Sequence, residues 1–166
     1  MVEILRRKLK VVERRYLKNQ LEYERYAILA LSSIYGVEIQ KDNVEACKNR
    51  LLGIFTHFYL KNYKKGAKSE LLRVAEFILN RNILWGNALD LKSPDEKDEP
   101  IIFSEWSLVK GSLIKRRDYS MANLVESRSF EGFNLFSDLG DEAFISKPVS
   151  DYPLTHFLKL GKNETL

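Results

Sequence analysis

The stretch DNVEACKNRLLGIFTHFYLKNYKKG, residues 42–66, predicts the second of three helices that form a bundle. Its apolar side chains recur every three or four positions, the spacing that places them on one face of an α-helix. The stretch ends with lysines before Gly66, and cations in a last turn suit the negative end of the helix dipole. The expected core face consists of Val44, Cys47, Leu51, Ile54, Phe55 and Phe58.

The sequence on either side predicts two more helices. Before this stretch, a four-three spacing of apolar and aromatic residues from residue 2 to Tyr35 predicts one long helix that ends at Gly36. After it, Ser69 begins a third helical pattern that closes near Gly86. Helices joined by short connections favour an antiparallel bundle. The stripe of the long helix is Leu5, Leu9, Val12, Tyr16, Tyr23, Tyr26 and Ala30.

Residues 93–100 mark the clearest boundary, because they combine two prolines and dense charge with no apolar side chain. We expect a basic helical bundle over residues 1–92, a charged loop over 93–100, and a C-terminal part over 101–166 that packs on the bundle within the same domain. Ile101–Phe103 fits either a short strand or a segment packed on the bundle. The aromatic segment Phe130–Phe136 is either a loop whose phenylalanines pack on the open side of the bundle or a docking surface for a partner. The predicted fold class is mainly α: a helical bundle of three longer N-terminal helices with a less regular C-terminal part of short helices and at most a short strand pair.

Charge is distributed unevenly along the chain. The 166 residues carry a formal net charge of +4. Residues 1–92 hold 18 lysines and arginines against 10 acidic residues, whereas the remainder holds 9 against 13. Excess positive charge attracts phosphate backbones and acidic protein surfaces. The basic half therefore indicates contact with DNA or RNA, without distinguishing the two.

The composition disfavours several classes of protein. A single cysteine, Cys47, forms no internal disulfide and fits a reducing compartment. The sequence after Met1 lacks the pattern of a signal peptide, and no apolar run approaches the roughly 20 residues of a membrane span. We therefore expect an intracellular protein, in the cytoplasm or with the nucleoid or nucleus, that does not enter a membrane. No glycine-rich phosphate loop is present, and His57 and His156 stand far apart, so no cofactor or metal site is expected.

The favoured hypothesis is a non-enzymatic accessory or adaptor subunit that binds nucleic acid through basic helices and docks on a protein partner. Cations interleaved with aromatic residues suit single-stranded nucleic acid, because phosphates are neutralised while bases stack on rings. The expected nucleic-acid-binding residues are Arg6, Arg7, Lys10, Arg14, Lys18, Lys61, Lys64, Lys65, Lys68, Lys115, Arg116 and Arg117.

An alternative hypothesis rests on Arg50 and His57, which are seven residues apart and therefore share a helix face about two turns apart. An imidazole can transfer a proton near neutral pH while a guanidinium holds a phosphate. The stretch RLLGIFTHFY, residues 50–59, resembles the HEPN family of helical bundles, which carry an arginine, a short gap, a histidine and often a tyrosine two positions later. This resemblance implies a metal-independent ribonuclease in which Arg50 binds phosphate, His57 is the general acid or base and Tyr59 positions the substrate.

A third hypothesis is a purely protein-binding helical subunit. The evidence for it is the four-three stripe of the long N-terminal helix, which suits pairing with another helix. The sequence leaves all three hypotheses open.

Overall fold

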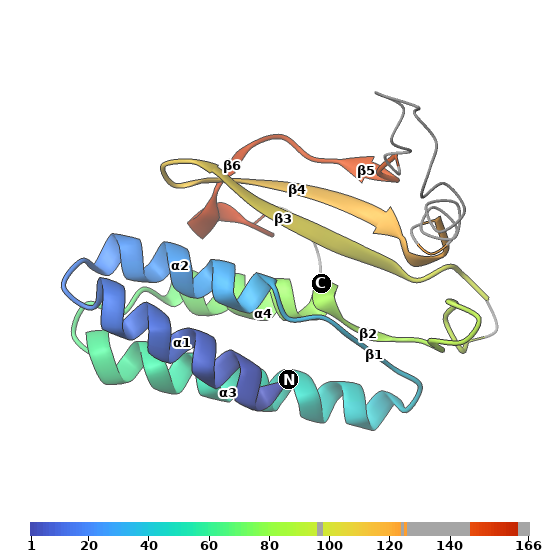
Figure 1. Cartoon of the computed structure of the whole chain (residues 1–166), viewed down its shortest axis with the longest axis horizontal. Coiled ribbons are helices and arrows are strands. Elements are labelled where there is room, and N and C mark those ends of the chain that lie inside the picture. The colour runs from blue at the N-terminus through green and yellow to red at the C-terminus, as the bar shows by residue number, and fades with distance from the viewer. Residues whose placement is uncertain (96–97, 124, 126–146, 163–166) are drawn as a thin grey trace, which may run out of the picture.

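The computed structural model describes residues 1–95, 98–123, 125 and 147–162. Four long α-helices pack side by side in a bundle (Figure 1). Each helix is antiparallel to the next along the chain, so the first and third run in the same direction (Figure 1). The helices are α1 (Val2–Tyr16), α2 (Gln20–Ser32), α3 (Lys41–Tyr63) and α4 (Ser69–Asn82).

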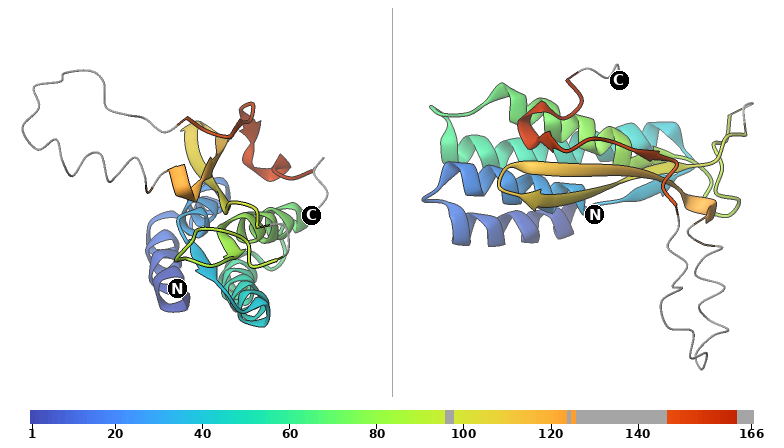
Figure 2. Two further views of the ribbon diagram at one scale, coloured as in Figure 1. Left: turned by 90° about the vertical axis from the view of Figure 1, so that its right-hand side faces the viewer. Right: turned by 90° about the horizontal axis from the view of Figure 1, so that it is seen from above.

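The strands form two small sheets. A parallel pair joins the segment after α2 to the segment after α4, with Gly36 opposite Ile83. An antiparallel hairpin lies over α2 and α4, and two short C-terminal strands pair with its second strand (Figures 1 and 2). The strands are β1 (Gly36–Glu38), β2 (Ile83–Trp85), β3 (Ile102–Lys110), β4 (Leu113–Ser120), β5 (Ser150–Asp151) and β6 (Thr155–His156), followed by the 3-10 helix η1 (Phe157–Lys159).

The prediction of one long helix up to Gly36 is wrong, because the chain reverses between α1 and α2. Asn19 is extended and caps α2, its side-chain oxygen accepting a hydrogen bond of 3.2 Å from the Glu22 backbone N–H. Gly36 does not end a helix either; it begins β1. The two halves of the expected helix pack against each other as an α1–α2 hairpin.

The two later helices are confirmed, with different ends. α3 covers the predicted stretch and buries Val44, Leu51 and Phe55. α4 begins at Ser69 as expected but ends at Asn82, where Ile83 leaves the helix and enters β2.

The fold class is mixed α/β and not mainly α. Eight residues of β4 pair with β3 in a long hairpin, so the strand pair is a principal element rather than a minor one. Its turn contains Gly111, whose φ of +56° is the left-handed conformation that glycine adopts without steric cost. The Phe130–Phe136 segment lies outside the described residues.

One apolar core joins the helices to the hairpin. Its fully buried members include Leu9 of α1, Leu31 of α2 and Ile78 of α4, and the hairpin adds Trp106 and Ile114. Among the described residues, no helix has the length and apolar character needed to cross a bilayer.

Candidate functional site

A groove of about 420 Å³ lies where α1 packs beside α3. Because the two helices run in the same direction, the first turns of α1 lie against the middle of α3 (Figure 1). Three of its side chains are cationic or titratable, and the others are apolar apart from one glycine. The lining residues are Val2, Arg6, Arg50, Gly53, Ile54, His57 and Phe58.

Glycine in the middle of a helix is unfavourable by about 1 kcal/mol relative to alanine. Gly53 stands at such a position in α3 and is exposed. A Cβ built on Gly53 would have no neighbouring atom within 4 Å, so close packing does not explain the residue. Because Gly53 has no side chain, the space on the helix surface between Arg50 and His57 is left unfilled.

The cations of the groove are weakly compensated. Arg6 approaches Glu3 at 3.7 Å, but both side chains are well exposed, and such pairs contribute little in water. Arg50 is exposed, and no carboxylate of the described residues pairs with it. The exposed His57 ring stands edge-on to Phe58, with 6.0 Å between ring centroids. These three side chains are therefore accessible to an anion.

An ion pair bridges the two helices next to the groove. Lys61, one turn beyond His57, donates to Glu13 of α1 at 2.8 Å, and its Nζ lies 6.0 Å from the Phe58 ring centroid. The hydrogen bond from Lys61 lowers the pKa of the Glu13 carboxyl below its ordinary value. A charged carboxylate is therefore held beside this end of the groove.

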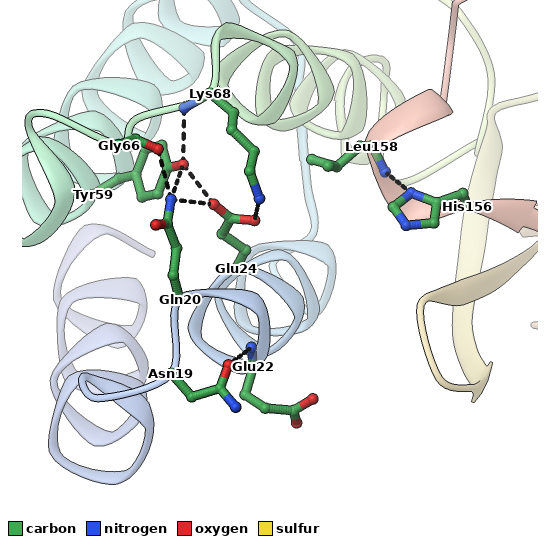
Figure 3. A network of polar contacts seen from close by, with 9 residues as sticks. All are labelled: Asn19, Gln20, Glu22, Glu24, Tyr59, Gly66, Lys68, His156 and Leu158. Atoms are coloured by element: carbon green, nitrogen blue, oxygen red, sulfur yellow. Dashed lines mark hydrogen bonds and ion pairs between the residues drawn. The ribbon is translucent and has the colours of Figure 1, made fainter.

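Tyr59 does not join Arg50 and His57, because residues two apart on a helix point to different sides. Its ring is buried, and its hydroxyl donates to Glu24 at 2.7 Å and accepts from the Lys68 backbone N–H at 3.0 Å (Figure 3). Gln20 also contacts this hydroxyl, at 3.4 Å. Burial raises the pKa of Tyr59 to about 12. The expected role for Tyr59 beside His57 is therefore wrong, and the residue instead ties α2, α3 and the start of α4 together.

The other predicted cations of the helices fall into two groups. Some are held by carboxylates: Lys61 by Glu13, Lys68 by the fully buried Glu24 at 2.6 Å, and Arg7 by Glu3 at 3.4 Å. Those for which the described residues show no ion pair are exposed on α1 and at the end of the bundle where α1 and α3 finish; they are Lys10, Arg14, Lys18, Lys64 and Lys65.

The run at residues 115–117 does not offer three free cations. Arg116 is only 2% exposed, and its guanidinium binds Asp118 at 2.7 Å, so its expected role in contacting nucleic acid is wrong. Alternation along β4 turns Arg116 inward, whereas its neighbours on the outer face pair with carboxylates of adjacent strands. These pairs are Lys115 with Asp151 and Arg117 with Glu105.

Sequence reasoning missed how the groove is assembled. It paired Arg50 with His57, and the structure brings Arg6 to them from another helix. Gly53 was the available signal, because a glycine inside a strong helical pattern needs an explanation. No group of three or more metal-binding side chains occurs within the part of the chain that the structure describes.

Comparisons with known proteins assign no family. No protein-family profile matches the chain. No curated protein and no solved structure matches it either.

Proposed function

We propose that the protein is a non-enzymatic accessory subunit that binds nucleic acid, with the α1–α3 groove as its principal contact, and that docks on a protein partner. The observation that supports this most is the gathering of Arg6, Arg50 and His57 around Gly53. A guanidinium offers two parallel N–H donors to phosphate oxygens, which makes arginine well suited to phosphate recognition.

Nearby cations extend the groove into a larger basic surface. Lys10 lies on α1 one turn beyond Arg6, and Arg14 follows one turn later. Lys64 and Lys65 add charge after the end of α3. Exposed cations of this kind supply the electrostatic part of nucleic-acid binding, which requires no base reading.

The test is a titration of labelled single-stranded and duplex oligonucleotides at several salt concentrations. Wild-type affinity should fall with salt, and each phosphate contact should contribute a slope of about −0.7 for single strands or about −0.9 for duplexes in a double-logarithmic plot. Arg50→Gln should weaken binding and reduce the magnitude of the slope by about one contact.

The matched control is Lys159→Gln. Lys159 is exposed on η1, which packs on α4, so this variant loses the same charge away from the groove. Wild-type binding that does not depend on salt would refute the proposal, as would equal effects of the two substitutions.

The groove also supports the alternative function, a metal-independent ribonuclease that uses Arg50 and His57. Arg6 adds a second guanidinium to the site, which could stabilise charge on a reacting phosphate. RNA cleavage in EDTA should then occur and be lost in His57→Ala. If the two proteins give the same cleavage rate, this alternative is excluded.

A further inference from the structure

We infer that the α1–α3 groove binds a nucleotide through its phosphomonoester group, either at the end of a nucleic-acid strand or as a free mononucleotide. The inference deepens the proposed function, on which the strand-end form rests, by naming the part of the ligand that the groove receives. It follows from the charges in the groove, from the ion pair at one end and from the apolar floor.

The charge in the groove matches a terminal phosphate better than an internal one. An internal phosphodiester carries one negative charge, whereas a phosphomonoester carries about −1.5 to −2 at pH 7. Arg6 and Arg50 supply two permanent positive charges, and His57 adds a further nitrogen donor. Two guanidiniums along one groove match the charge of a phosphomonoester better than that of a single phosphodiester.

The ion pair between Lys61 and Glu13 marks one end of the uncompensated charge in the groove. It links α3 to α1 one turn beyond His57, directly beside Phe58. Lys61 is already compensated by Glu13 at 2.8 Å, so this position offers a second phosphate less charge than the groove does. The strongest uncompensated charge therefore lies within the groove, where a phosphate at a chain end can reach it.

The floor of the groove suits the rest of a nucleotide. Val2, Ile54 and Phe58 provide apolar surface, and the missing side chain of Gly53 leaves room above it. The volume, about 420 Å³, lies within the range of pockets that bury one small ligand. A sugar and a flat base can therefore lie on the floor while the phosphate meets the arginines.

The direct test compares one labelled oligonucleotide phosphorylated at the 5′ end, at the 3′ end or at neither. Binding should be about tenfold tighter for one of the phosphorylated forms, as expected for the added charge-assisted hydrogen bonds. Adenosine 5′-monophosphate and adenosine, titrated by calorimetry, test the free-nucleotide form, and only the monophosphate should bind.

Two variants locate the effect in the groove. Gly53→Leu should fill it and abolish the preference for phosphorylated ligands, while its melting temperature stays at or above that of the wild type because leucine favours helix over glycine. Arg50→Lys keeps the charge but loses the paired donors, so it should reduce the preference. Asn43→Leu is the matched control: Asn43 is exposed on the same helix, ten residues before Gly53 and therefore about 15 Å from it along the axis, and the preference should survive there.

The outcomes separate this inference from the proposed function. If all three oligonucleotides bind equally and adenosine monophosphate does not bind, the inference is refuted while general nucleic-acid binding stands. If no oligonucleotide binds but the monophosphate does, in a manner that Gly53→Leu removes, the groove is a mononucleotide site and the proposed function fails. If Gly53→Leu retains the full preference, the phosphate is bound elsewhere and the inference is wrong.

Discussion

Replacing Asp118 with alanine should destabilise the protein more than any surface substitution, because it removes a carboxylate that binds a buried guanidinium through two hydrogen bonds. Arg116 is 2% exposed and binds both oxygens of Asp118, at 2.9 and 2.7 Å. Ser104 and Tyr152 donate to the same carboxylate, at 2.6 and 3.2 Å. The centroid of the Tyr152 ring lies 4.0 Å from the Arg116 guanidinium carbon. The ring therefore packs on the guanidinium and shields its charge from water.

The expected loss follows from this burial. Removing one partner of a buried ion pair costs about 3–5 kcal/mol. For a domain of this size, 1 kcal/mol corresponds to a shift of about 2–4 °C in the melting temperature, so Asp118→Ala should melt roughly 6–20 °C below the wild type. The free energy of unfolding of the whole protein is expected to be only about 5–15 kcal/mol, so this one substitution removes a large fraction of it.

Urea unfolding followed by circular dichroism measures the effect, with Glu105→Ala as the control. Glu105 pairs with Arg117 on the outer face of the same hairpin, where the side chains are 36% and 37% exposed. An exposed pair of this kind contributes at most about 1 kcal/mol. Equal losses for Asp118→Ala and Glu105→Ala would refute the reasoning.

The pH dependence gives a second readout of the same site. Burial alone would raise the pKa of Asp118, but the hydrogen bonds from Arg116, Ser104 and Tyr152 outweigh it and lower the pKa below the ordinary value of 3.8. A carboxyl with a lowered folded-state pKa stabilises the fold above its unfolded-state pKa, and the contribution is lost as the pH falls through the folded-state value. Stability of the wild type should therefore decline more steeply than that of Asp118→Ala below about pH 4.

Three further predictions concern other parts of the fold. Tyr59→Phe removes a hydrogen-bond donor to the fully buried Glu24 and should lower the unfolding free energy by about 1–2 kcal/mol; an unchanged urea midpoint would contradict it. Burial raises the pKa of both Tyr23 and Tyr59 to about 12, so their contribution to stability is full below pH 10 and is lost from there to about pH 12. Ultraviolet titration should find these two tyrosines un-ionised at pH 11, and complete tyrosine ionisation of folded protein at that pH would be inconsistent with the structure. Gly161→Ala should lower the free energy of unfolding by about 2–4 kcal/mol, because φ at this residue is +64° and the added Cβ would lie 2.4 Å from the Phe77 ring. A melting temperature equal to that of the wild type would contradict this prediction.

Local signals in the sequence were sufficient to predict part of the helical layer. α3 was predictable because its buried residues, such as Leu51, Phe55 and Phe58, keep helical spacing over the whole element. The break between α1 and α2 was also readable. Asn19 followed three residues later by Glu22 is the sequence signature of a helix start, but the four-three spacing happened to continue across the turn and concealed it.

The hairpin was harder to predict because its inner face is partly polar. A half-buried strand is recognised by alternation of apolar and polar residues. In β4 the inward positions include Arg116 and Asp118, and the outward positions include Lys115 and Arg117, so no alternation of hydrophobicity is visible. The burial of these charges depends on Ser104 and on Tyr152, which are distant in sequence, and no local pattern contains that information.

The site was predictable only in the part that lies on one helix. The seven-residue spacing of Arg50 and His57 was enough to place them on one face. The arrival of Arg6 depends on α1 lying parallel to α3, and this follows only if the chain reverses at Asn19. The error in the first helix therefore hid the third charged group of the groove.

The parallel pairing of β1 with β2 has a consequence for motion at the groove. The two strands clasp the chain just before α3 and just after α4, so this pair of helices is tethered at both its entrance and its exit. Among the described residues α1 is not joined to either strand of this pair, and the three-residue turn at Leu17–Asn19 connects it to α2. We therefore expect the groove to widen by movement of α1, while the wall formed by α3 stays in place.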